Sequence, residues 1–201
     1  MSSRTARKSA RNTSVVYRLA WLTLGVLFAG MMIAIIVANR VVPKIATEAP
    51  AFNPLAAGDS APPFSVTTSH GPFSLASARR PVFLEVFATW CPHCQHETAV
   101  LNALYDRFKN RVDFVAVSGS PFAFDRTSPE SLGDIELFMR YFSVRYPVAF
   151  DPTMAVANHY LQSGYPTIAI IGTNKRISFI GTGEISRQKL ASKLRRVLAE
   201  R

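Results

Sequence analysis

The stretch PVFLEVFATWCPHC, residues 81–94, decides the fold of this chain. Residues 82–87 form a nearly continuous apolar run, which is expected of a central strand buried on both faces. Two cysteines, Cys91 and Cys94, follow after a short connection. Pro92 lacks an N–H group and therefore suits the first turn of a helix. The stretch predicts a buried strand that leads directly into the N-terminus of a helix, with the cysteines at that junction.

Cys91 and Cys94 are the only cysteines in the 201 residues, so they form either a local redox pair or half of a metal site. A helix N-terminus stabilises a thiolate through its free N–H groups and positive dipole end, and the thiolate is the nucleophile in disulfide exchange. We therefore predict that Cys91 attacks and that Cys94 is the resolving thiol of a redox-active disulfide. A zinc site needs two further ligands. Consecutive helical residues such as His93 and His96 do not all face one ion, so no metal is predicted.

Strands and helices alternate on both sides of this junction. A hairpin is predicted around residues 69–71, and Asp151 with Pro152 resembles an N-cap followed by proline at the first helical position. The other predicted elements are a helix carrying Val100, Leu104 and Phe108 on one face, strands 112–117, 147–150, 167–171 and 177–180, and helices 131–142, 151–161 and 186–198. This order predicts an α/β fold with a parallel central sheet and added antiparallel strands.

The N-terminal part of the chain predicts a membrane anchor. Residues 19–39 contain no charge and are long enough to span a bilayer as one helix. The basic segment 1–18 precedes the span, so the positive-inside rule places the N-terminus in the cytoplasm and the rest outside. Residues 40–57 are predicted to be a linker, and 58–201 the exported domain. A cleaved signal peptide is the alternative, and it would also export the domain to a compartment where disulfides persist.

Trp-Cys-Pro-His-Cys after an apolar strand resembles the active site of the thioredoxin superfamily. Residues 58–201 resemble its membrane-anchored TlpA-like branch, which includes ResA- and CcmG-type thiol–disulfide oxidoreductases, through Phe87-Ala88-Thr89-Trp90-Cys91 and an inserted strand and helix within 113–163. The resemblance implies a thioredoxin-like fold. It also implies that Pro166, in Gly-Tyr-Pro-Thr, is cis and lies against the cysteine pair, and that the Tyr165 backbone pairs with the substrate chain. Trp90, Pro92 and His93 are expected to contribute to substrate binding.

Glu85 interrupts the predicted central strand, where a charge is costly unless it is paired or neutralised. It matches the buried acid of thioredoxin, and that resemblance implies that it exchanges a proton with Cys94. Many TlpA-like proteins carry an uncharged residue here, so a structural carboxylate paired with a basic neighbour is the alternative. His93, when protonated, favours a thiolate. Cys-Pro-His-Cys resembles the motif of DsbA, a strong oxidant, although DsbA's large helical insertion is absent.

The leading hypothesis is dithiol–disulfide exchange with exported proteins, without a dissociable cofactor. The resemblance implies a reductase of the cytochrome c maturation type, fed by a membrane electron donor. The alternatives are a disulfide-forming oxidant, a copper-binding protein or metallochaperone that uses the same cysteines, and a thiol peroxidase. Most of the excess positive charge lies near the N-terminus, and no nucleic-acid motif is present. Phe122 and Phe124 either line a substrate groove or cover the inserted helix; the sequence leaves both open.

Overall fold

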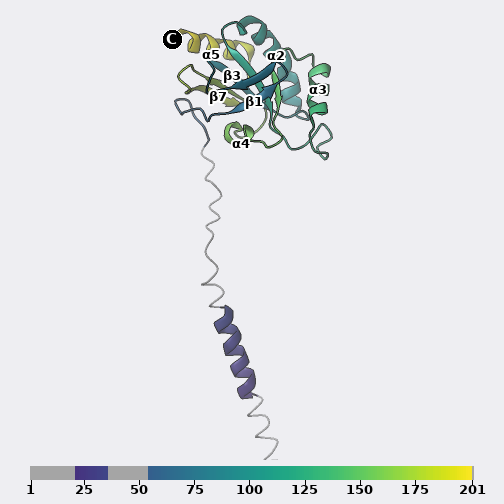
Figure 1. Cartoon of the computed structure of the whole chain (residues 1–201), viewed down its shortest axis with the longest axis vertical. Coiled ribbons are helices and arrows are strands. Elements are labelled where there is room, and N and C mark those ends of the chain that lie inside the picture. Colours follow the sequence, from purple (N-terminus) through teal and green to yellow (C-terminus); the bar gives the residue numbers. More distant parts are fainter. Residues whose placement is uncertain (1–20, 36–53, 201) are drawn as a thin grey trace, which may run out of the picture. The chain divides into compact units, whose positions relative to one another are not determined.

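The structure is a computed structural model that describes residues 21–35 and 54–200. The chain divides into two units, Met1–Phe52 and Asn53–Arg201, which are considered separately. Residues 21–35 are helical (Figure 1), and their large apolar side chains are exposed. Within the described ranges, no helix has the length and apolar character needed to cross a membrane. The predicted 19–39 span lies partly outside those ranges, as do residues 1–18 and most of the predicted linker.

The second unit is built on one seven-stranded sheet with the order β2-β1-β5-β4-β3-β6-β7. The central strands β3, β4 and β5 are parallel, while β6 and β7 are antiparallel additions at one edge and the β1–β2 hairpin forms the other. The strands are β1 (Ser65–Thr68), β2 (Gly71–Ser74), β3 (Val82–Phe87), β4 (Asp113–Ser118), β5 (Val148–Phe150), β6 (Thr167–Ile171) and β7 (Ile177–Thr182). This arrangement confirms the predicted thioredoxin-like α/β fold.

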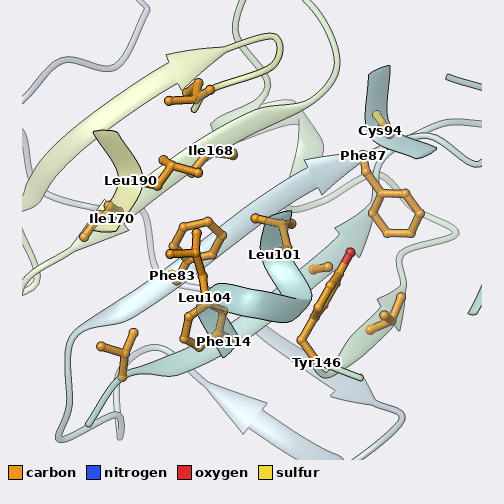
Figure 2. Close-up of a cluster of buried hydrophobic side chains, with 14 of the residues drawn as sticks. Phe83, Phe87, Cys94, Leu101, Leu104, Phe114, Tyr146, Ile168, Ile170 and Leu190 are labelled. Carbon is orange, nitrogen blue, oxygen red and sulfur yellow. The ribbon is translucent and has the colours of Figure 1, made fainter. Parts of the chain in front are cut away.

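Two apolar layers cover the two faces of the sheet. On one face, Phe83 and Phe87 of β3 pack with the apolar sides of α2, α3 and α5. Figure 2 shows the part of this cluster that includes Leu101 and Leu104 of α2 and Leu190 of α5. On the other, Leu84 and Val86 pack against α4 and the segment that precedes β1. The helices are α2 (Pro92–Phe108), α3 (Leu132–Tyr141), α4 (Ala157–Tyr160) and α5 (Arg187–Ala199). Burial on both faces explains why every residue of β3 is buried.

Most elements match the sequence-based predictions, but the predicted helix 151–161 is wrong in its first half. Asp151 does act as a cap, since its carboxylate accepts hydrogen bonds from the N–H groups of Ala155 and Val156. Met154 has a φ of 54°, a left-handed conformation that interrupts a helix. The chain therefore makes turns over residues 152–156, and only α4 is helical.

The strand pairing brings the two predicted site motifs together. β6 runs antiparallel to β3, and Thr167 at its start pairs with Val86 near the end of β3. The residues just before β6 therefore lie beside the residues just after β3. These are Pro166 and the turn that leads to Cys91, 75 positions apart in the sequence.

Candidate active site

Cys91 occupies the N-cap position of α2. Its backbone is extended, with φ −81° and ψ 116°, and Pro92 follows at the first helical position. The carbonyl of Cys91 accepts the N–H of Gln95 at 3.1 Å, which closes the first turn. No acidic residue of α2 itself lies in that turn, so the positive end of the helix dipole points towards the Cys91 sulfur.

Cys94 lies one turn further along α2 and is fully buried, whereas Cys91 is 4% exposed. Both are free thiols. Figure 2 shows Cys94 at the end of the apolar cluster beside Phe87. Burial, and after it the charge of Glu85, raises the pKa of the Cys94 thiol far above its usual value. Cys91 is therefore the more accessible thiol of the two, and the raised pKa keeps the Cys94 thiol protonated near neutral pH. That Cys91 attacks and Cys94 resolves stays a prediction.

The Tyr165–Pro166 bond is cis, which confirms the prediction for Pro166. The Cys91 thiol faces the carbonyl oxygen of Tyr165 at 3.7 Å, a long hydrogen bond to sulfur. The Tyr165 hydroxyl donates to the carbonyl of Gly119, and this bond fixes the ring on the β4 side of the site. The Tyr165 backbone thus lies beside the Cys91 sulfur, and its pairing with a substrate chain stays a prediction.

Trp90 is fixed in the turn between β3 and α2. Its indole N–H donates to the Ser120 hydroxyl at 2.8 Å, and its ring meets the Tyr165 ring edge-on with centroids 5.7 Å apart. The Arg126 guanidinium lies 4.9 Å from the centroid of the Trp90 ring, which is a cation–π distance. Trp90 is therefore held by the β4–α3 loop on one side and by the Pro166 loop on the other.

The buried carboxyl of Glu130 ties the same β4–α3 loop to the active-site turn, and the sequence analysis did not identify it. Its oxygens accept hydrogen bonds from the hydroxyls of Thr89, at 2.8 Å, and Ser118. Burial raises its pKa, although both hydrogen bonds act in the opposite direction. A polar residue in a loop of Ser, Thr and Pro gives no sequence signal for such a role.

Glu85 lies beneath the cysteine pair, on the core side. Burial and then the charge of Glu97 raise its pKa well above the usual value, while a hydrogen bond from the Tyr146 hydroxyl lowers it. No ion pair between Glu85 and a basic side chain occurs among the described residues. Its charge acts on Cys94, so the arrangement fits a proton acceptor for that thiol; the catalytic role of Glu85 stays a prediction.

Glu97 is a second buried carboxyl that the sequence analysis missed. It is 2% exposed, three residues after Cys94, and its Oε1 is the one buried side-chain atom without a hydrogen-bond partner in the described part of the chain. Burial raises its pKa to about 7, aided by the charge of Glu184 and opposed by the N–H of Ile185. Residues three apart share one helix face, which is the sequence signal that could have found it.

His93 points away from the core towards the β7–α5 connection. Its Nδ1 lies 2.7 Å from Oε1 of Glu184, and Nδ1 of His96 lies 3.6 Å from the same oxygen. These contacts lower the pKa of Glu184, the hydrogen bond with His93 most of all. Across residues 21–35 and 54–200, no cluster of three or more His, Cys, Asp and Glu side chains could hold a metal ion.

A model of the AhpC/TSA family matches residues 57–180, which include both cysteines and Pro166 and end within β7, before Glu184. The chain belongs to the AhpC/TSA family. Thiol-disulfide oxidoreductase ResA of Geobacillus kaustophilus is 29% identical over 140 residues, covering 68% of this chain and 75% of the relative. Thioredoxin-like protein YneN of Bacillus subtilis is 27% identical over 139 residues, covering 68% and 78%.

Solved structures of other thioredoxin-like proteins share the fold of this AhpC/TSA-family chain. A Chlorobium tepidum protein described as a candidate thiol:disulfide interchange protein DsbE superposes with a TM-score of 0.62 at 24% identity, over 72% of this chain and 99% of that one. StoA of Bacillus subtilis superposes with a TM-score of 0.56 at 19% identity, over 66% of this chain and 96% of StoA. Together, the relatives and the cysteine geometry make this AhpC/TSA-family member a thiol–disulfide oxidoreductase.

Proposed function

We propose that this oxidoreductase is a membrane-anchored reductase that transfers electron pairs to disulfides of exported proteins. The observation that carries the proposal is the pairing of a reachable Cys91 beside Tyr165 with a buried Cys94 above two carboxyl groups. The TlpA-like resemblance implies cytochrome c maturation as the setting and a membrane dithiol as the electron donor.

The reaction follows from these positions. The Cys91 thiolate attacks one sulfur of the partner disulfide, and the other partner sulfur leaves as a thiolate. Cys94 then gives its proton to Glu85 and attacks the Cys91 sulfur, which breaks the mixed disulfide and releases the second partner sulfur as a thiolate. Two electrons have passed to the partner, and the Cys91–Cys94 pair is left as a disulfide for the donor to reduce.

The charges around the cysteines favour the reductase direction. A disulfide is a strong oxidant when its reduced form is stabilised, as in DsbA. Here Glu184 offsets the positive charge that a protonated His93 would place near Cys91, and burial together with the charge of Glu85 disfavours a second thiolate at Cys94. Each effect withholds stabilisation from the reduced pair and lowers its reduction potential.

The reduction potential of the full-length protein tests this direction, with Glu184→Gln as the variant. In graded glutathione buffers we expect a wild-type value near the thioredoxin value of about −270 mV, and not near about −120 mV as in DsbA. Glu184→Gln leaves the His93 charge unbalanced and should shift the dithiol–disulfide equilibrium roughly threefold towards the dithiol, or about 14 mV.

Glu136→Gln is the matched control, because it removes the same charge from an exposed carboxylate on α3 that pairs with Arg140. It should leave the potential unchanged. The effect of Glu184→Gln should also vanish when His93 is replaced by Gln. A wild-type potential near the DsbA value would overturn the reductase direction, and an unchanged potential in Glu184→Gln would overturn the role given to Glu184.

The anchor and the outward orientation are supported by the sequence, through the uncharged segment 19–39 and the basic residues before it. We expect the chain to stay with the membrane after carbonate extraction, and the domain to be digested by protease added to intact spheroplasts. Release by carbonate would contradict the anchor, and protection from protease would contradict the orientation.

A further inference from the structure

A groove beside the active site runs between the first turn of α2, the β4–α3 loop and α3. It encloses a volume of about 700 Å³, within the range of about 300–1,000 Å³ that is typical of binding sites. Its walls are mainly apolar and come from Phe124, Leu137, Tyr141 and Phe142, and Gln95 closes the end nearest the cysteines.

α3 exposes large apolar side chains to solvent on this side although it already buries another face. Ile135 and Phe138 pack into the core, whereas Leu137 is 47% and Tyr141 is 77% exposed. A soluble surface gains nothing from such exposure, and contiguous exposed apolar residues mark interaction sites. Phe124 belongs both to the groove wall and to the core packing under α3. It lines the groove, and its ring centroid lies 6.2 Å from that of Phe138.

The charged groups in the groove wall are acidic, in a chain with a formal net charge of +10. Asp125 accepts hydrogen bonds from Ser128 and from the N–H of Thr127, which lower its pKa to about 2 and keep it ionised. Asp134 caps the N-terminus of α3 with Ser131. No ion pair of either aspartate with a described basic residue occurs, so both carboxylates are available to a basic partner group.

The groove is continuous with the reacting centre. The Gln95 side chain donates to the carbonyl of Thr89 at 2.8 Å, in the turn that holds Cys91, and Ser120 of the loop accepts from Trp90. Gln95 is about one helical turn, or about 5 Å, from Cys91 along α2. An extended chain advances about 3.3 Å per residue, so a peptide joined to Cys91 reaches the groove about two to four residues from its own cysteine.

We propose that this groove binds the segment of the substrate protein next to its reacting cysteine and selects a large apolar side chain accompanied by Lys or Arg. The inference rests on the proposed function, because it names the partner of the same site. The apolar side chain fills the space between Phe124 and Leu137, and the basic group meets Asp125 and Asp134. The oxidoreductase thereby prefers disulfides in such a setting over disulfides in acidic or plain polar segments.

Disulfide-linked dimers of synthetic peptides test the preference. Each of three peptides carries one central cysteine, with two test residues placed on each side of it at the second to fourth positions. The test residues are Leu and Lys in the first peptide, Leu and Glu in the second, and Ser and Lys in the third. The reduced full-length protein is mixed with each dimer, and quenched samples are scored for the oxidised protein by mass spectrometry. We expect half-saturation at roughly tenfold lower concentration for the Leu–Lys peptide than for the other two.

Leu137→Ser should remove the advantage of Leu, and Asp125→Asn should reduce that of Lys over Glu. Leu132→Ser is the matched control, since Leu132 is exposed at the start of α3 but does not line the groove; it should keep the full preference. Equal half-saturation for all three peptides overturns the groove proposal alone. Failure to reduce oxidised glutathione and every peptide would instead overturn the proposed function.

Discussion

Cys91→Ser should lose all disulfide reductase activity, down to the background of the buffer. A serine hydroxyl is not ionised at neutral pH and does not attack a disulfide sulfur, and Cys94 is too deeply buried to replace the nucleophile. The measurement is insulin reduction by the full-length protein with dithiothreitol as the electron source. Activity that persists in this variant would show that Cys94, and not Cys91, meets the partner.

Cys94→Ser should fail in a different way. Cys91 still attacks, but no thiol is left to release the partner, so mixed disulfides accumulate at Cys91. We expect them as reductant-sensitive bands of higher mass after thiol blocking, with about one partner per chain. The Cys91→Ser/Cys94→Ser double variant is the control and should trap nothing. If Cys94→Ser also traps nothing in intact membranes, exchange with exported proteins is wrong.

The junction that carries these cysteines was predictable because its determinants are local. Six buried residues in a row specify β3, and Pro92 after Cys91 specifies the start of α2. The position of Pro166 beside them is not local, and only resemblance placed it there. The pairing of β6 with β3 explains it.

The rest of the site depends on contacts that a sequence does not display. Glu184 meets His93 across 91 positions, and Glu130 reaches Thr89 across 41. Glu97 is the exception, because its spacing of three residues from Cys94 places it on the helix face of that cysteine. The first half of the predicted helix 151–161 failed for the opposite reason: the local cap at Asp151 was predicted correctly, but the left-handed backbone of Met154 delays the helix until Ala157.

Glu97→Gln should change how stability depends on pH. The folded chain holds the Glu97 proton up to about pH 7, whereas the unfolded chain releases it near 4.5. Between these values the folded state binds more protons, so stability falls as pH rises. The loss is on the order of 3 kcal/mol by pH 8, at about 1.4 kcal/mol per pKa unit. Glutamine has no proton to lose, so the variant should be more stable than wild type at pH 8 and similar at pH 4.5.

Denaturant unfolding at pH 4.5, 6 and 8 measures the difference. Glu136→Gln again serves as the control, because its exposed carboxylate should not alter the pH slope. Glu85 also has a raised pKa and stays in the variant, so some slope should remain, and the difference between the curves belongs to Glu97. Identical curves would mean that Glu97 does not hold its proton in the folded chain.

A buried acid that destabilises the fold near neutral pH needs a compensating use, since selection tolerates such a cost mainly at functional sites. The charge of Glu97 raises the pKa of Glu85, and the charge of Glu85 raises that of Cys94. Glu97→Gln therefore weakens the affinity of Glu85 for the Cys94 proton. We expect the variant to be more stable and yet slower to resolve its mixed disulfides, which single-turnover mixing with oxidised glutathione would show.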